Sequence, residues 1–151
     1  MKRVWHFLKN AMGVVFRHPV TGTSIIAKLP DGRIAMLRRR DNGLWSLPGG
    51  IVDWGEDIPT VVSRELREET GLEVTKISRL VGVYSDFHRD PRMHCICIAV
   101  EVEATGVMRV GDPLEVMEVQ GFYPGAFPVG HLAHDHDRQL RDYFAGLTTL
   151  A

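Results

Sequence analysis

Cysteine is scarce in this chain, and neither sign of charge is in excess. The two cysteines, Cys95 and Cys97, are too few for a disulfide framework. Their spacing places both side chains on one face of a strand, and a reducing, cytoplasmic compartment is expected. Lys and Arg number 18 against 19 Asp and Glu, which gives a net charge of -1. Because the charges nearly cancel, we expect no nucleic-acid partner, and any polyanion must be held by a local site.

Long apolar runs are also missing, so no membrane span is expected. Residues 1–18 combine basic and apolar residues, but Lys9 and Asn10 interrupt the apolar run and no small-residue cleavage site follows. The apolar residues there keep helical spacing, which predicts an N-terminal amphipathic helix. Three roles stay open for this helix: packing on its own domain, contact with a second copy in a homodimer, or binding to a membrane surface or a partner protein.

The remaining residues, 19–151, have the size and composition of one folded domain. Hydrophobic residues make up 44% and charged residues 25% of the 151-residue chain. Turn residues and alternating patterns predict a mixed α/β (α+β) order with two helices. The expected strands are Ser24–Leu29, Arg33–Leu37, Leu80–Tyr84, Met93–Glu103 and Val116–Tyr123, and the expected helices are Ile58–Thr70 and Asp137–Ala145. The first two strands form a hairpin around Pro30-Asp31-Gly32.

The helix Ile58–Thr70 concentrates carboxylates at the end of its apolar side. At about 100° per residue, that side holds Ile58, Val61, Val62, Glu65, Leu66, Glu68 and Glu69. Glu65 and Glu69 form a like-charge pair near the helix C-terminus, where the macrodipole also disfavours anions. Partial burial of these anions requires a compensating positive charge. A divalent cation would supply that charge.

The type of ligand limits which cation fits. No His or Cys lies on this side of the helix, and ligation by oxygen alone favours Mg²⁺ or Mn²⁺ over zinc. On the three glutamates alone, a solvated acidic helix end explains the pattern equally well. Three histidines near the C-terminus match no standard ligand spacing, so surface or capping roles are expected for His131, His134 and His136.

The spacing around this helix is more specific than the helix itself. From Gly50 the chain reads GIVDWGEDIPTVVSRELREETGL, with Glu56, Arg64-Glu65-Leu66, Glu68-Glu69 and Gly71-Leu72 at fixed intervals. This segment resembles the signature of the Nudix hydrolase superfamily at every fixed position. The resemblance extends from about Thr21 through Pro128. It implies a Nudix fold, in which a mixed β-sheet is sandwiched between helices.

The resemblance also implies an activity and a set of site residues. Nudix hydrolases cleave a nucleoside diphosphate linked to another group, using water and Mg²⁺ or Mn²⁺. By this resemblance Glu56 supports the ligand cluster, and Arg64 makes an orienting ion pair with the loop or a neighbouring glutamate. The implied metal ligands are the carboxylates of Glu65, Glu68 and Glu69 and the carbonyl of Gly49.

A general base outside the signature is often supplied in this family by a later glutamate. Aligning the strand from Glu118 to Phe122 with the family's pattern places Glu115 at that position. Asp112, Glu101 and Glu103 are alternatives, although the last two alternate along a strand as solvent-facing residues do.

The segment Val83–Arg92 is similar to the stretch that follows the signature in the ADP-ribose pyrophosphatase branch. This resemblance implies ADP-ribose or a similar nucleoside diphosphate sugar as the substrate. Phe87 stands where those enzymes usually carry a proline. Phe87 and Tyr84 either stack on a base or fill the core. The arginines that offer phosphate contacts are Arg38, Arg39, Arg40, Arg89 and Arg92, and alternation places the first and third on one face.

These features leave more than one function open. A Mg²⁺-dependent hydrolase of ADP-ribose or a nucleotide sugar is the first interpretation, since all four glutamates of the signature are present. A nucleoside triphosphate pyrophosphohydrolase that removes damaged nucleotides, like MutT, is the second. A Nudix-fold module that binds nucleotides without turnover is the third. In each case the partner is a small nucleoside phosphate.

Overall fold

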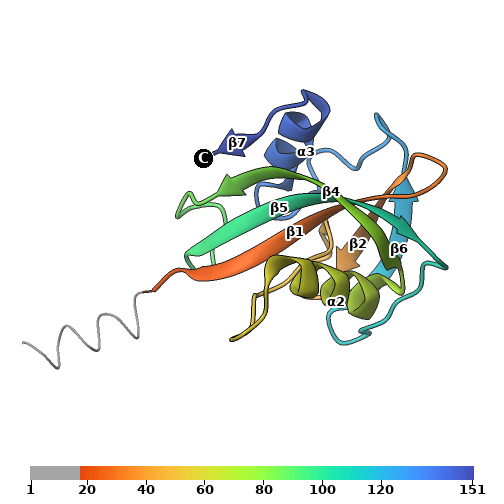
Figure 1. Ribbon diagram of the computed structural model, residues 1–151, viewed down its shortest axis with the longest axis horizontal. Coiled ribbons are helices and arrows are strands. Elements are labelled where there is room, and N and C mark those ends of the chain that lie inside the picture. Colours follow the sequence, from red (N-terminus) through yellow and green to blue (C-terminus); the bar gives the residue numbers. More distant parts are fainter. Residues whose placement is uncertain (1–17) are drawn as a thin grey trace, which may run out of the picture.

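A computed structural model describes residues 18–151, which form a seven-stranded mixed sheet with one helix on each face (Figure 1). The N-terminal helix expected in residues 1–18 falls almost wholly outside the described residues. The elements in chain order are β1 (Val20–Lys28), β2 (Ile34–Arg39), β3 (Trp45–Ser46), α2 (Ile58–Thr70), β4 (Glu73–Tyr84), β5 (Cys95–Thr105), β6 (Val116–Phe122), α3 (His136–Phe144) and β7 (Thr149–Leu150).

The centre of the sheet is a long parallel pair. The strand order is β3-β2-β1-β5-β4-β7, and β6 pairs with β2. Strand β1 runs parallel to β5 from the pair Val20 and Cys95 to the pair Lys28 and Glu103. The expected hairpin is confirmed, because β1 and β2 pair in antiparallel fashion with Ala27 opposite Ala35.

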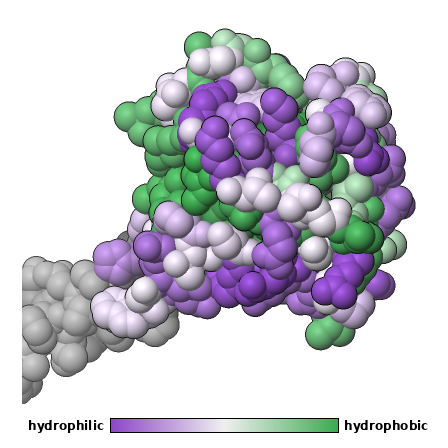
Figure 2. All heavy atoms as spheres, turned by 45° about the vertical axis from the view of Figure 1, so that its right-hand side comes forward, coloured by the Kyte–Doolittle hydropathy of each residue, from purple (hydrophilic) through white to green (hydrophobic). Residues whose placement is uncertain are grey.

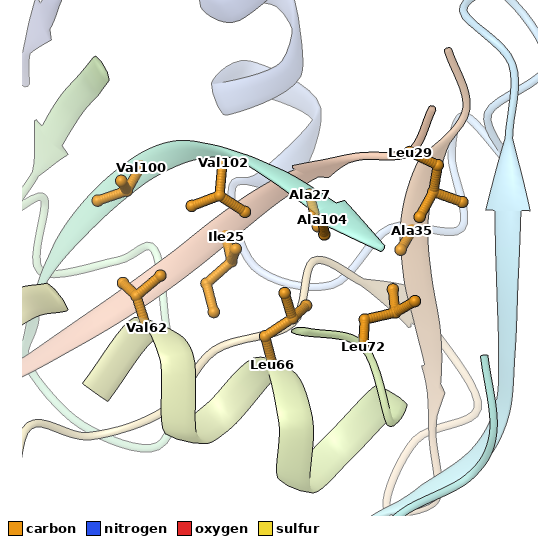
Figure 3. Close-up of a cluster of buried hydrophobic side chains, with 10 residues drawn as sticks. All are labelled: Ile25, Ala27, Leu29, Ala35, Val62, Leu66, Leu72, Val100, Val102 and Ala104. Carbon is orange, nitrogen blue, oxygen red and sulfur yellow. The ribbon is translucent and has the colours of Figure 1, made fainter. Parts of the chain in front are cut away.

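Alternation along the strands creates two cores, one on each face of the sheet. On one face, Ile25 and Ala27 of β1 pack with Val62 and Leu66 of α2 (Figure 3). On the other face, side chains from β1 and β2 pack with Leu140 of α3. The two helices therefore lie on opposite faces, and the mixed sheet between helices is confirmed.

Helix α2 begins and ends where the sequence predicts. The side chain of Asp57 accepts a hydrogen bond from the Thr60 amide, and Pro59 lies in the first turn, where no amide donor is needed. Gly71 ends the helix at φ 73°, and its N–H donates to the Arg67 carbonyl. These caps fix the helix in the position from which its carboxylates project.

Strand β4 is the largest difference from the sequence-based expectation. It begins at Glu73 rather than Leu80, and its first half is mostly exposed. Three register shifts against β5 interrupt the alternation on which a sequence-based prediction depends. Strands β3 and β7, of two residues each, carry too short a pattern to predict.

On the face drawn in Figure 2, areas of hydrophilic side chains lie beside areas of hydrophobic ones. Within residues 18–151, no helix combines the length and apolarity needed to cross a bilayer.

Candidate active site

The loop after β3 carries the two glycines that bring the backbone to the carboxylates of α2. The amides of Thr23 and Ile25 donate to the carbonyls of Gly50 and Pro48, both at 2.8 Å, so the loop is fixed against β1. Gly49 adopts φ 148°, and a Cβ there would lie 2.2 Å from the Thr23 carbonyl oxygen. Only glycine fits this close approach.

Glu69 is the buried carboxylate of the site, with 9% of its surface exposed. Its Oε2 accepts a hydrogen bond from the Gly49 amide at 2.9 Å. Burial raises the pKa of Glu69 to about 8, and this amide opposes the rise, while nearby Glu65 and Glu115 add to it. Without a cation, the Glu69 carboxyl group therefore holds its proton at neutral pH.

Arg64 holds the other carboxylates of the signature. Its Nε and Nη2 donate to the two carboxylate oxygens of Glu56 at 2.7 and 2.8 Å, and Nη1 donates to Glu65 at 2.7 Å and Glu68 at 3.3 Å. The hydrogen bonds to Glu56 contribute most to raising the pKa of Arg64, so it stays charged. This is the ion pairing with the loop and neighbouring glutamates that the sequence predicts for Arg64.

The carboxylates open into one cavity of about 430 Å³. Glu65, Glu68 and Glu69 contribute to its wall together with Gly49 and Gly50. In residues 18–151, no three acidic, thiol or imidazole side chains already converge as ligands of one ion. Two of the glutamates, Glu65 and Glu68, instead pair with Arg64.

The residues nevertheless fit Mg²⁺ or Mn²⁺ in their chemistry. The wall offers carboxylate oxygens without histidine or thiol at the helix, which is the donor set that hard divalent cations prefer. In its ionised form, Glu69 buried beside Glu65 would need a positive charge nearby, which a divalent cation would supply. Glu65, Glu68 and Glu69 would hold the ion, and Gly49 borders the same wall.

The acidic residues outside α2 separate into two groups. Glu115 and Asp112 line the cavity, and the charge of Glu115 raises the pKa of both Glu65 and Glu69. Glu101 instead accepts a hydrogen bond from Tyr143, and Glu103 pairs with Lys76. The structure thus brings Glu115 to the candidate site and keeps Glu101 and Glu103 away from it.

The predicted phosphate-binding arginines also separate. Arg39, Arg89 and Arg92 line the cavity, whereas Arg38 and Arg40 do not. Arg38 donates to the Gly43 carbonyl, and Arg40 donates to the Pro113 carbonyl at 2.7 Å. Alternation in β2 is the reason, because it turns Arg39 to the opposite side from Arg38.

The two predicted aromatic contacts do not lie on the cavity wall. Tyr84 is 1% exposed in the core, and its hydroxyl donates to Asp142 at 2.9 Å. Burial raises the pKa of Tyr84 to about 12. Phe87 is 63% exposed and packs edge-on against His88 and His94. Core filling, the alternative left open from sequence, describes Tyr84.

The histidines correct another expectation. His131 is exposed as expected, but a surface role is wrong for His136, which is 5% exposed, and for His134, since both line the cavity. Asp90 and Ser46 also line the cavity and were missed. Their position depends on contacts between segments far apart in sequence, which no local pattern reveals.

Comparisons with known proteins agree with this geometry. A family model described as the NUDIX domain matches residues 18–145. An ADP-ribose pyrophosphatase of Methanocaldococcus jannaschii is 37% identical over 134 residues, covering 85% of this chain and 75% of that protein. A putative 8-oxo-dGTP diphosphatase of Bacillus subtilis is 30% identical over 125 residues, covering 83% and 80%.

Solved structures share the fold. The NUDIX domain of Shewanella oneidensis NrtR, complexed with ADP ribose, superimposes with a TM-score of 0.78 at 19% identity, covering 93% of this chain and 96% of that one. A MutT NUDIX hydrolase from Burkholderia pseudomallei has a TM-score of 0.73 at 28% identity, covering 83% and 98%. The NUDIX family model matches most of this chain, and the signature glutamates line one cavity. This chain therefore belongs to the Nudix hydrolase family.

Proposed function

We propose that this Nudix hydrolase cleaves the diphosphate of ADP-ribose, or of a similar nucleoside diphosphate sugar, in the presence of Mg²⁺ or Mn²⁺. The observation that carries the proposal is the wall of Glu65, Glu68 and Glu69 in a cavity that arginines also line. The relative from M. jannaschii, an ADP-ribose pyrophosphatase, supports this choice of substrate.

Each group of the wall has a task in this reaction. The carboxylates of Glu65, Glu68 and Glu69 would hold the cation, and the Gly49 amide keeps the Glu69 side chain in place. The cation, when bound, supplies positive charge to the diphosphate oxygens and promotes attack by water on phosphorus. Arg64 pairs with Glu65 and is itself held by Glu56, so these two ion pairs fix the Glu65 carboxylate.

Glu115 is our candidate for the general base. It lies in the loop before β6, lines the same cavity as Glu65 and Glu69, and is exposed. There it would accept the proton of the attacking water. Its backbone carbonyl accepts a hydrogen bond from the Arg40 amide at 2.8 Å, which anchors the loop to β2.

A second candidate function is hydrolysis of a nucleoside triphosphate to the monophosphate and pyrophosphate. The similarity to a putative 8-oxo-dGTP diphosphatase favours it. The same wall would serve, because both reactions break a phosphoanhydride. The test is a panel of ADP-ribose, nucleotide sugars, dinucleoside polyphosphates and nucleoside triphosphates with Mg²⁺. AMP release from ADP-ribose that far exceeds pyrophosphate release from any triphosphate supports the first function, and the reverse order supports the second.

Location and assembly extend the proposal. We place the protein in a reducing cytoplasm, because two cysteines are too few for a disulfide framework. A homodimer formed through the N-terminal residues stays a prediction, which light scattering on the full chain and on a chain lacking residues 1–17 tests.

A further inference from the structure

The side of the cavity opposite α2 is built from residues with no task in the steps above. Arg89 and Asp90 come from the segment between β4 and β5, and His136 begins α3 on the other face of the sheet from α2. All three side chains line the cavity and are at most 9% exposed. Burying so many polar groups is unfavourable unless each finds a partner.

Arg89 has two guanidinium nitrogens without a partner in the described residues. Its Nη2 donates to Asp135 at 2.8 Å, while its Nε is fully buried and makes no hydrogen bond. Among the buried side-chain nitrogen and oxygen atoms of the described residues, this Nε alone is unsatisfied. Because Nε has almost no accessible surface, neither water nor a ligand oxygen reaches it. Nη1 also lacks a partner but is not among the buried atoms, so it is the donor of Arg89 that a ligand in the cavity can reach.

His136 presents a second donor. Its Nδ1 accepts the amide hydrogen of Leu47 at 3.1 Å, so the neutral ring carries its proton on Nε2. Burial keeps the pKa of His136 well below its usual value, and the ring is therefore neutral at physiological pH. No hydrogen bond from Nε2 to any other residue occurs in the part of the chain that the structure describes.

The charges on this side of the cavity cancel. Arg89 pairs with Asp135 at 2.8 Å, Asp90 pairs with Arg92 at 2.9 Å, and burial lowers the pKa of His134, which lies 3.7 Å from Asp90. A phosphate would meet no net positive charge here. A neutral hydroxyl group fits better, because it accepts from Arg89 and His136 and can donate to the Asp90 carboxylate.

We infer that Arg89 and His136 form a binding subsite that donates hydrogen bonds to hydroxyl oxygens of the sugar linked to the diphosphate, with Asp90 as the acceptor. This inference rests on the proposed function, since the substrate must carry such a sugar. It assigns the two sides of the cavity different tasks. The α2 side binds the diphosphate through cations, and the side of Arg89 and His136 selects the group attached to it.

The test measures binding of two products that cannot be cleaved further, ribose 5-phosphate and AMP, to the full chain in MgCl₂ by calorimetry. Arg89→Lys keeps the positive charge beside Asp135 and removes the Nη1–H donors. His136→Asn keeps an acceptor for the Leu47 amide and removes Nε2–H. Arg33→Lys, at an exposed ion pair with Asp31, is the matched control. Melting curves confirm that each variant folds. If only one of Arg89→Lys and His136→Asn folds, that variant alone carries the test.

We expect each of the two subsite variants to weaken ribose 5-phosphate binding about tenfold or more, with AMP binding changed less than about twofold. Unchanged binding of ribose 5-phosphate, weaker binding of AMP instead, or no binding of ribose 5-phosphate to the wild type would each overturn the inference. The substrate panel is separate from this test. Cleavage of ADP-ribose with unaltered ribose 5-phosphate binding in both variants removes the subsite alone, while failure to cleave ADP-ribose and every nucleotide sugar of the panel removes the proposed function.

Discussion

At the scale of single residues, the site depends on close contacts between the loop after β3 and the glutamates of helix α2. Gly49 donates its amide to Glu69, and Gly50 lies directly against Glu65. The glycines therefore act through the carboxylates that they position. Substituting these glycines changes the position of the carboxylates on the cavity wall without changing the charge of the wall.

Gly50→Ala tests this geometry. A Cβ at Gly50 would lie 2.3 Å from Glu65 Oε1, so the carboxylate must move from its place beside Arg64. We expect kcat/KM to fall about tenfold or more, with little change in melting temperature, because Glu65 is a flexible side chain. Full activity would show that the position of Glu65 is not critical.

Glu115→Gln tests the general base. The amide keeps the size of the side chain but cannot accept the proton of the attacking water, so kcat should fall by about 100-fold or more. Mg²⁺ affinity, measured by calorimetry, should stay nearly unchanged because Glu115 is not among the predicted ligands. The same substitution at Glu118, which is outside the cavity lining, is the control. A near-normal rate for Glu115→Gln would transfer the role to another residue, with Asp112 the first alternative.

At the scale of elements, α2 links the core to the chemistry. Its buried residues Val62 and Leu66 face the sheet (Figure 3), and Glu65 and Glu69 of the same helix line the cavity. Packing of the helix therefore sets the direction of the carboxylates. The sequence predicted this helix to the residue because its cap, proline and terminal glycine all lie within one short segment.

Leu66→Ala should destabilise the protein by about 3 kcal/mol, because it leaves a cavity where the side chain is fully buried. Denaturant unfolding measures this change. Leu114→Ala, at a side chain that is 84% exposed, should change the free energy of unfolding by less than about 0.5 kcal/mol. Equal effects at the two positions would contradict the packing of α2 described above.

Elements formed by distant contacts were less predictable. The first half of β4 lacks a clear alternation because it is largely exposed and shifts register against β5. The cavity wall also depends in part on contacts between residues far apart in the sequence. The glutamates of α2 follow from local spacing, whereas His136 reaches the cavity only because α3 packs on the other face of the sheet. A local sequence pattern cannot predict a tertiary contact of this kind.

At the scale of the whole molecule, the buried Glu69 couples stability to pH. Its folded pKa of about 8 lies above the ordinary value of 4.5, so the folded state binds the proton more tightly than the unfolded state. Stability from this group is complete below pH 4.5 and is lost as the pH rises toward 8. A bound cation would remove this loss by stabilising the ionised carboxylate.

We therefore expect the metal-free wild type to lose stability relative to Glu69→Gln as the pH rises from about 5 to about 8. Melting temperatures of both proteins in EDTA measure this difference. The contribution of His136 cancels because both proteins contain this residue. With Mg²⁺ present, the wild type should become the more stable of the two at pH 8. A difference that does not change with pH would contradict the buried, protonated Glu69.

The central claim is that the carboxylates of α2 hold divalent cations for cleavage of a diphosphate. Its most direct measurement is the rate of AMP release from ADP-ribose by wild type and Glu69→Gln across a Mg²⁺ titration. The account predicts a saturable dependence on Mg²⁺ in the wild type, no turnover in EDTA, and a loss of at least about 100-fold in the variant. Equal rates in the two proteins, or turnover in EDTA, would contradict it.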